Sequence, residues 1–266
     1  TVSPMSSGSN PLSRDLRGRH VLITGGSSGI GLALAQQAAA AGAKVSLIAR
    51  SREKLDAART AIRVAVPAAT DIAVAAGDVA VQREALGALA EVERVHGAVE
   101  VLITSAGVAQ AGYFEAMPVE VFERAMAVNY FGTLYLLKAV VPAMRRRGSG
   151  AVVLISSGAG LWGFFGYTAY GPSKFAVCGL AESLRAELQG TGVQVSVCCP
   201  PDTDTPQLTE EIRTRPVETT AAAAHAGMWT ADAVARVTLV GLARGQFLIT
   251  PGLALTALAW WRSLVA

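Results

Sequence analysis

The sequence is poor in cysteine and histidine, and this scarcity limits the chemistry open to it. Its three cysteines, Cys178, Cys198 and Cys199, form neither a disulfide framework nor a C-x-x-C pair. This favours a reducing compartment and core positions for Cys198 and Cys199. The three histidines are scattered along the chain, so we expect no histidine-based triad and no metal site. They are His20, His96 and His225.

Charged residues are also few. They make up 16% of the chain against 52% hydrophobic residues, and the net charge is +3. The longest basic run, Arg145-Arg146-Arg147, fits the C-terminal end of a helix, where cations suit the dipole. Nucleic-acid binding is therefore not expected. The hydrophobic excess indicates large buried interfaces or contact with a membrane.

No apolar run reaches the length of a complete membrane span. The stretch from Phe247 to Trp261 comes closest, but Pro251-Gly252 interrupts it. The first ten residues are rich in Ser, Gly and Pro and show no signal-peptide pattern. We therefore divide the chain into a disordered N-terminal tail (1–18), one domain (19–250) and a hydrophobic C-terminal segment (251–266).

Short runs of Val, Ile and Leu alternate with longer helical patterns. The predicted strands are His20–Thr24, Val45–Ala49, Ile72–Ala76, Val99–Thr104, Ala151–Ser156 and Val193–Cys199. The predicted helices are Gly29–Ala41, Arg52–Ala65, Gln82–His96, Pro118–Arg146 and Tyr170–Gln189. This alternation predicts an α/β fold, a doubly wound parallel sheet (Rossmann fold) with helices on both faces. We interpret the irregular stretch from Pro200 to about Thr230 as a mobile substrate lid, because ligands bind at the carboxyl ends of such strands.

A glycine-rich turn joins the first predicted strand to the first predicted helix. Its glycines permit a tight turn and a close backbone approach, and the helix N-terminus attracts a pyrophosphate. The turn therefore predicts a dinucleotide site. The expected contacts are Gly25, Ser27, Ser28, Gly29, Ile30 and Gly31.

The end of the second predicted strand favours NADPH over NADH. Sheets that bind NAD usually carry an acid here for the ribose 2′-hydroxyl, whereas this sequence has Arg50 and, one helical turn on, Lys54. Two cations, with the hydroxyls of Ser27 and Ser28, suit a 2′-phosphate. The alternative is that both cations are merely exposed. Asp78 is a candidate for the adenine edge or, alternatively, a cap of the next helix.

Tyr170 and Lys174 lie one turn apart on the same face of a predicted helix, which Pro172 requires to begin near Tyr170. A nearby cation lowers the pKa of a phenol, so Tyr170 is the expected proton donor to a carbonyl. Lys174 can also hold the nicotinamide ribose. Ser157, at a strand end, can bind the substrate oxygen. Asn129 is either a satisfied core amide or the holder of a water behind Lys174.

These residues resemble the short-chain dehydrogenase/reductase superfamily over about Arg19 to Thr250. The resemblance implies a homodimer or homotetramer built on the two longest helices. It also implies a catalytic tetrad of Asn129, Ser157, Tyr170 and Lys174, and further cofactor contacts from Val79, Ala106, Pro200 and Thr203. One departure is Thr104-Ser105-Ala106-Gly107 where the family has Asn-Asn-Ala-Gly, which puts a sheet-stabilising contact in doubt. Another is Pro200-Pro201 where the family has Pro-Gly.

The segment Pro200–Pro206 is similar to that of the 3-ketosphinganine (3-ketodihydrosphingosine) reductases, as is Gly163–Tyr170. This resemblance implies NADPH-dependent reduction of a long-chain keto-lipid to sphinganine, in sphingolipid biosynthesis. It further implies the endoplasmic reticulum membrane, with the catalytic domain facing the cytosol; a cytoplasmic enzyme is the alternative. An alkyl slot, or else ordinary core, is formed by Leu161, Trp162, Phe164 and Phe165. Candidates for a substrate ammonium, or else merely solvated acids, are Asp202, Asp204, Glu210 and Glu211.

Three other functions stay open at this point. One is a reductase of a β-ketoacyl thioester, steroid or retinoid. Another is a non-catalytic NADP(H)-binding regulatory protein, although a pure binder needs no proton donor such as Tyr170. The third is a membrane-anchored structural subunit, supported only by the C-terminal stretch, inside which the sequence stops. That end fits a truncated or a naturally short, peripheral form.

Overall fold

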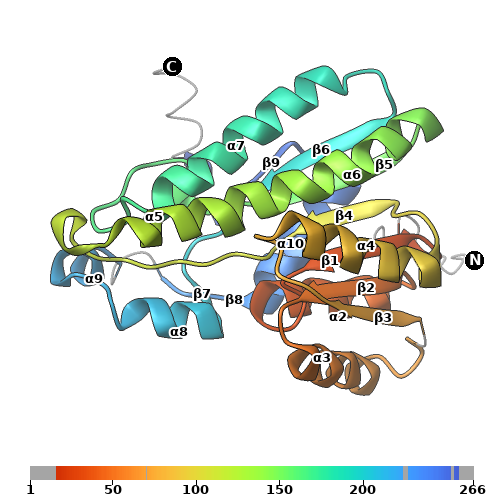
Figure 1. The fold of residues 1–266 in the computed structure, drawn as a ribbon, viewed down its shortest axis with the longest axis horizontal. Helices are drawn as coiled ribbons and strands as arrows, with labels where there is room; N and C mark the ends of the chain where they lie inside the picture. The colour runs from red at the N-terminus through yellow and green to blue at the C-terminus, as the bar shows by residue number, and fades with distance from the viewer. Residues whose placement is uncertain (1–15, 70, 224–226, 253–254, 258–266) are drawn as a thin grey trace, which may run out of the picture.

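The computed structural model describes residues 16–69, 71–223, 227–252 and 255–257. Within them, seven strands form a central parallel sheet in the order β3-β2-β1-β4-β5-β6-β9 (Figure 1). The chain runs outward from β1 in one direction and then from β4 in the other, which confirms the predicted doubly wound sheet. A crevice for ligands is expected where the order reverses, between β1 and β4.

The strands of this sheet lie close to where the sequence predicts them, except the last. They are β1 His20–Thr24, β2 Lys44–Ala49, β3 Ile72–Ala76, β4 Val101–Thr104, β5 Gly150–Ile155, β6 Val193–Cys198 and β9 Leu248–Ile249. The edge strand β9 was not predicted, because a strand of two residues shows no periodicity.

Helices cover both faces of the sheet and divide the core in two. On one face Leu34 of α2 (Gly29–Ala40), Leu55 of α3 (Arg52–Ala65) and Leu239 of α10 (Ala231–Ala243) are buried in one cluster. On the other face lie α4 (Gln82–His96), α6 (Gly132–Arg147) and α7 (Tyr170–Glu187), which bury a second cluster. Burial on both faces is the reason that these strands are almost uniformly apolar.

The long helix predicted from Pro118 to Arg146 is not uniform. It begins as α5 (Val119–Ala125), continues through a π-helical turn at Met126–Phe131 and becomes α6. This turn was not predicted, since a single extra residue hardly disturbs helical periodicity. It contains Asn129, so the irregularity lies at a predicted site residue.

The described residues between Pro200 and Thr230 form regular elements rather than an irregular segment. It contains β7 (Thr203–Asp204), α8 (Pro206–Ile212), α9 (Val217–Ala223) and β8 (Trp229–Thr230), and β7 pairs with β8. The Thr205 side chain caps α8 by accepting the Leu208 N–H at 3.2 Å. Figure 1 shows α8 and α9 together near one end of the molecule, with β7 and β8 leading back to α10.

The domain includes residues that the sequence assigns to the N-terminal tail. Leu16 is only 1% exposed, and the Gly18 N–H donates to the Gly42 carbonyl at 2.8 Å. The rest of that tail, His225 and most of the C-terminal segment fall outside the described residues. Among the residues described, no helix combines the length and the apolar composition needed to cross a bilayer.

Candidate active site

A cavity of about 1000 Å³ lies past the carboxyl ends of the strands. Its lining comes from the turn before α2, the ends of β2 to β6, the start of α7 and the segment from Pro200 to Glu211. The predicted cofactor residues all contribute to it: Gly25, Ser27, Ser28, Gly29, Ile30, Gly31, Arg50, Lys54, Asp78, Val79, Ala106, Tyr170, Lys174, Pro200 and Thr203. Ser157 lines it as well, and Asn129 does not.

The glycine turn brings its backbone against the loop after β4. Gly25 has a φ of +66°, and a Cβ there would lie 2.8 Å from the Ala106 Cα. A Cβ on Gly31 would collide with the Gly25 carbonyl oxygen. Neither position accepts a side chain, which leaves the start of α2 open to the cavity. Ser28 precedes α2 without capping it through its side chain, so its hydroxyl is not used by the helix.

Cations gather at one end of the cavity. Arg50 and Lys54 line it there, and Arg124 of α5 joins them, donating to Asp78 Oδ2 at 3.0 Å. Asp78 Oδ1 accepts the Ala80 N–H at 3.0 Å. Burial opposes the ionisation of Asp78, but these two hydrogen bonds outweigh it and lower the pKa of the carboxyl. Asp78 does not cap α4, which begins after Val81.

Tyr170 is the first residue of α7, as Pro172 requires, and is 8% exposed. Its hydroxyl is hydrogen-bonded to the side chain of Ser157. Burial raises the pKa of Tyr170, which outweighs the lowering by Ser157, and the negative charges of Glu211 and Asp202 raise it further. The lowered pKa expected from Lys174 is therefore wrong for this structure. The phenol is protonated at neutral pH, which is the form that gives a proton away.

Lys174 lies beneath Tyr170 on the same helix face. Its Nζ is 5.7 Å from the centroid of the Tyr170 ring and donates to the Ile155 carbonyl oxygen at 3.0 Å. Burial lowers the pKa of Lys174 to about 8. The side chain is therefore still mostly a cation at pH 7, but close to losing its proton.

Asn129 points away from the cavity and holds a loop in place. Its Oδ1 accepts the Val108 N–H at 2.9 Å, and its Nδ2 donates to the Val108 carbonyl oxygen at 3.0 Å and to Ser173 Oγ at 2.8 Å. The side chain thus matches the core-amide alternative. It fixes the loop that carries Gly107, where a Cβ would lie 3.4 Å from Lys174 Nζ.

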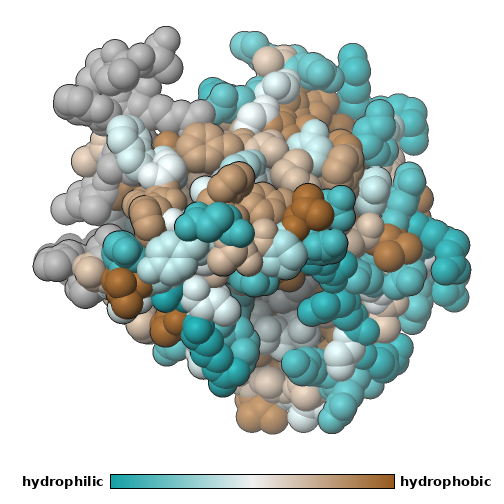
Figure 2. Space-filling model, turned by 60° about the vertical axis from the view of Figure 1, so that its left-hand side comes forward, coloured by the Kyte–Doolittle hydropathy of each residue, from teal (hydrophilic) through white to brown (hydrophobic). Residues whose placement is uncertain are grey.

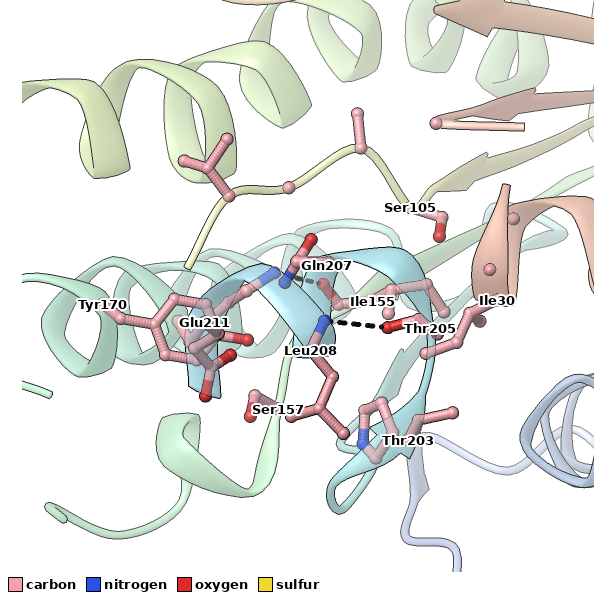
Figure 3. A pocket seen from close by; sticks show the side chains of 18 of the residues that line it. Ile30, Ser105, Ile155, Ser157, Tyr170, Thr203, Thr205, Gln207, Leu208 and Glu211 are labelled. Carbon is pink, nitrogen blue, oxygen red and sulfur yellow. Dashed lines mark hydrogen bonds between the residues drawn. The ribbon is translucent and has the colours of Figure 1, made fainter. Parts of the chain in front are cut away.

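Several residues of the cavity were missed from sequence. Thr205, Gln207 and Leu208 reach it from α8 (Figure 3), and Tyr167 lines it from the loop before α7. These side chains follow from the placement of α8, which has no motif of its own. Of the predicted alkyl slot, Phe164 and Phe165 line the cavity, whereas Leu161 is buried in the core and Trp162 is 47% exposed.

The family departure at Thr104 has a visible consequence. Thr104 is 3% exposed, and its Oγ1 has no hydrogen-bond partner in the described part of the chain. Thr24 at the end of β1 instead holds the neighbouring loop, since its Oγ1 accepts the N–H groups of Ser105 and Ala106, both at 3.1 Å. The doubt about a sheet-stabilising contact is therefore justified.

Two histidines that are far apart in sequence meet at the opposite end of the sheet. His20 is bound to the Gly97 carbonyl oxygen at 2.8 Å and to Ser46 Oγ at 2.8 Å, and Ser46 Oγ contacts His96 Nδ1 at 3.0 Å. They are not scattered in the fold as expected. Desolvation lowers the pKa of both rings, so the buried His20 and the half-buried His96 form a neutral, hydrogen-bonded pair.

A doubly wound parallel sheet with a glycine turn at its switch point, and a serine, tyrosine and lysine around one cavity, define a dinucleotide-dependent oxidoreductase. The sequence model of the family described as short chain dehydrogenase matches residues 19–216. The chain belongs to the short-chain dehydrogenase family.

Named relatives lie within this family. The 3-dehydrosphinganine reductase of Danio rerio is 37% identical over 92% of this chain and 74% of its own length. The 3-dehydrosphinganine reductase TSC10B of Arabidopsis thaliana is 40% identical over 87% of this chain and 69% of its own. Among solved structures, a short-chain dehydrogenase from Sphingobium yanoikuyae in complex with NADPH superposes with a TM-score of 0.80 at 28% identity, covering 93% of this chain and 92% of that one.

Proposed function

We propose that this chain reduces the 3-keto group of 3-ketosphinganine to the alcohol of sphinganine, with NADPH as the hydride donor. The observation that carries the proposal is the convergence of Ser157, Tyr170 and Lys174 on one wall of a cavity with cations at its far end. The likeness to named 3-dehydrosphinganine reductases from a fish and a plant supports the choice of ketone.

Each residue of the wall has one task in this reaction. A bound dinucleotide supplies the hydride that adds to the carbonyl carbon. Ser157 Oγ accepts the Ala159 N–H at 3.1 Å, and its own hydroxyl proton, which faces Tyr170, can be donated to the carbonyl oxygen of a bound ketone. Tyr170 gives its proton to that oxygen as the C=O π bond opens, so the product is a neutral alcohol. The Lys174 ammonium stabilises the phenolate that remains.

The preference for NADPH rests on the cationic end of the cavity. Arg50, Lys54 and Arg124 there surround one acid, Asp78, which Arg124 already pairs. Arg50→Asp is expected to lower the ratio of kcat/KM for NADPH over NADH by about 100-fold, the scale of losing a charge-assisted phosphate contact and adding a like charge. Arg52→Asp is the matched control, because Arg52 is two residues further along, at the start of α3, and does not line the cavity. An unchanged ratio in Arg50→Asp contradicts the assignment.

An apolar rim beside the cavity supports delivery of the substrate from a membrane surface. Phe114 is 66% exposed, Phe165 58% and Val217 75%. They belong to three segments that are joined by a Tyr113–Phe165 ring contact at 6.1 Å and a Tyr113–Glu218 hydrogen bond at 3.1 Å. Figure 2, which turns this end of the molecule forward, shows hydrophobic side chains gathered among polar ones. The rim supports contact with a membrane, and the choice of the cytosolic face of the endoplasmic reticulum rests on the resemblance to the 3-ketosphinganine reductases.

Flotation with phosphatidylcholine vesicles tests this surface. The double variant Phe114→Ser, Val217→Ser should float less than the unaltered protein, because each serine removes an exposed apolar side chain. Val64→Ser is the control, since Val64 is 76% exposed on α3. Equal flotation of all three proteins argues for the cytoplasmic alternative.

Helices α5 to α7 also support a homodimer or homotetramer. Phe131 is 41% exposed and stacks on Tyr135 of α6, with 6.1 Å between the ring centroids. Exposed stacked aromatics are enriched at protein interfaces. Analytical ultracentrifugation should show an oligomer that Phe131→Asp weakens; a monomer at micromolar concentration contradicts it.

Oxidation of NADPH in the presence of a ketone panel tests the reaction itself. We expect the highest kcat/KM for 3-ketosphinganine and much lower values for an acetoacetyl thioester and a 3-ketosteroid. Turnover of the thioester or the steroid at an equal or higher kcat/KM transfers the function to that alternative. If the protein binds NADPH but neither binds nor reduces any ketone of the panel, the alternative of a non-catalytic regulatory protein is favoured.

A further inference from the structure

A buried ionic cluster lies at the end of the cavity opposite the cations. Glu211 of α8 accepts hydrogen bonds at Oε1 from Tyr167 Oη, from Arg215 Nε at 3.0 Å and from Arg215 Nη2 at 2.6 Å. Arg215 also pairs with Asp202 Oδ2 at 2.8 Å. The side chains of Arg215 and Glu211 are 4% and 8% exposed, so this pair is enclosed by protein, whereas the Asp202 side chain is 33% exposed.

The acids of this cluster face the cavity and the cation does not. Glu211, Asp202 and Tyr167 line the cavity, whereas Arg215 is outside its lining. Figure 3 shows Glu211 beside the Tyr170 ring, with Ser157 nearby. The influence of Glu211 and Asp202 on the pKa of Tyr170 agrees with this proximity. A ligand that reaches Tyr170 therefore meets carboxylates, with the guanidinium behind them.

The cluster has more negative than positive charge. It contains the carboxylates of Glu211 and Asp202 against the single guanidinium of Arg215. Tyr167 stays neutral, because burial and the neighbouring Glu211 raise the pKa of its phenol. Lys174 does not balance the excess, since its ammonium is bonded to Ile155 and neither acid contributes to its pKa. Glu211 is the enclosed acid and shares its one cation with Asp202. A carboxylate that is enclosed and only partly balanced is costly, and a cation from a ligand relieves that cost.

One oxygen of Glu211 remains for such a ligand. All three hydrogen bonds to this carboxylate in the described part of the chain end at Oε1. Arg215 and Tyr167 hold Oε1 from two sides, which fixes the plane of the carboxylate and the direction of Oε2. A fixed acceptor loses little side-chain entropy when it binds.

We infer that Glu211, assisted by Asp202, binds a primary ammonium on the carbon next to the ketone that is reduced. The inference rests on the proposed function, because in 3-ketosphinganine the amine-bearing carbon is bonded directly to the carbonyl carbon. When that carbonyl lies at Tyr170 and Ser157, the ammonium must lie within a few bond lengths of them, where Glu211 stands. Arg215 and Tyr167 act as positioning residues. The two ends of the cavity thus bind groups of opposite charge. The cationic side chains bind the phosphate of the dinucleotide, and the carboxylates bind the ammonium of the substrate.

The sequence left four acids as candidates for binding the substrate ammonium, and the structure places two of them at the cavity and two outside it. Glu210 is 68% exposed and pairs with Arg213 at 2.7 Å, and Asp204 is exposed. Neither lines the cavity. Glu210 is therefore a matched control for Glu211: the same side chain, on the same helix, one position away.

The test compares 3-ketosphinganine with its analogue lacking the amine, 1-hydroxyoctadecan-3-one, in detergent micelles with NADPH. The wild-type protein should prefer the amine, and Glu211→Gln should lower the ratio of the two kcat/KM values by about 10- to 100-fold, the scale of one charge-assisted hydrogen bond. The change should come mainly from KM for the amine. Glu210→Gln should keep the wild-type ratio.

The outcomes separate this inference from the proposed function. If wild type does not reduce 3-ketosphinganine, the proposed function fails and the inference with it. If wild type reduces it but shows no preference for the amine, or Glu211→Gln keeps the preference, the inference alone is overturned. Should Glu211→Gln fail to bind NADPH by fluorescence titration, the wild-type preference and Asp202→Asn, expected to lower the same ratio, decide the matter.

Discussion

At the scale of single residues, burial shifts the pKa values of Tyr170 and Lys174 in opposite directions. The same low-polarity surroundings raise the pKa of the Tyr170 phenol and lower that of the Lys174 ammonium, because each shift favours the neutral form. A phenol that keeps its proton is loaded for reduction, since an alkoxide is a much stronger base than a phenolate and takes the proton readily.

Tyr170→Phe removes the hydroxyl group that carries this proton and keeps the rest of the ring. We expect kcat for ketone reduction to fall by about 100- to 10,000-fold, the usual contribution of a general acid. NADPH affinity, measured by fluorescence titration, should change little because the ring remains. A variant with wild-type kcat contradicts the assignment of Tyr170 as proton donor.

The lowered pKa of Lys174 leads to a prediction for how kcat/KM depends on pH. Its pKa of about 8 means that the free enzyme loses the cation as the pH rises through about 8, while Tyr170, with its raised pKa, keeps its proton there. We expect kcat/KM for reduction to be level below this pH and to decline above it. Lys174→Arg should be less active but show no decline, because a guanidinium stays charged. A flat wild-type profile from pH 7 to 9 excludes Lys174 as the titrating group.

The sequence predicted that Ser157, Tyr170 and Lys174 come together at one cavity, but not their electrostatics. Tyr170 and Lys174 are one turn apart on a helix, so their proximity follows from local geometry. The hydrogen bond between Glu211 and Tyr167 depends on how α8 is packed against the loop before α7, which no local pattern encodes. Burial, and with it the sign of the shift at Tyr170, is likewise a tertiary property.

At the scale of elements, the ends of two adjacent strands each carry a threonine, Thr24 on β1 and Thr104 on β4, and only Thr24 holds the loop that follows β4. Thr24 Oγ1 accepts hydrogen bonds from two N–H groups, whereas Thr104 Oγ1 has no hydrogen-bond partner among the described residues. Thr24→Val should lower the free energy of unfolding by about 1–3 kcal/mol, because two inward-facing N–H groups lose their acceptor. Thr104→Val should leave it unchanged or raise it by up to about 1 kcal/mol, since a buried hydroxyl without a partner is removed.

Urea denaturation of both variants measures the difference. The two substitutions are chemically identical and lie on adjacent strands, so each controls for the other. Equal destabilisation by both contradicts the division of tasks between Thr24 and Thr104.

Most elements of the sheet could be predicted because they are long and periodic. Helices α2, α3 and α4 begin where expected and end within a residue of the expected place. The short elements β7, β8, β9 and α9 could not, because two- to seven-residue segments owe their structure to the surfaces they pack on. The π-helical turn was missed for a related reason: it changes the hydrogen-bond pattern without changing the residues.

At the scale of the whole molecule, the two ends of the sheet have different sensitivities to pH. The linked His20, which is buried, and His96, which is half-buried, lie at the end remote from the cavity, and desolvation lowers the pKa of both rings below the ordinary 6.5. Near and below pH 6.5 the unfolded chain takes up protons that the folded chain resists. The free energy of unfolding should therefore fall as the pH drops through about 6.5.

Thermal or urea unfolding between pH 8 and pH 5 tests this. His20→Asn should lower stability at pH 8, because a buried hydrogen-bonded ring is lost, yet show a shallower decline toward pH 5. An unaltered slope in His20→Asn, or a wild-type stability that rises as the pH falls, contradicts the role given to His20.

The π-helical turn also determines how α6 is rotated about its own axis. An extra residue in a helix turns everything after it by roughly 100° about the axis. In α6 this phase directs Leu136 and Val140 into the core and leaves Phe131 on the outside. Asn129 faces inward from the same turn, so one inserted residue sets both the loop beside Lys174 and the face that α6 presents to solvent. Deleting a residue between 126 and 131 would therefore alter the interior and the exterior of the molecule together.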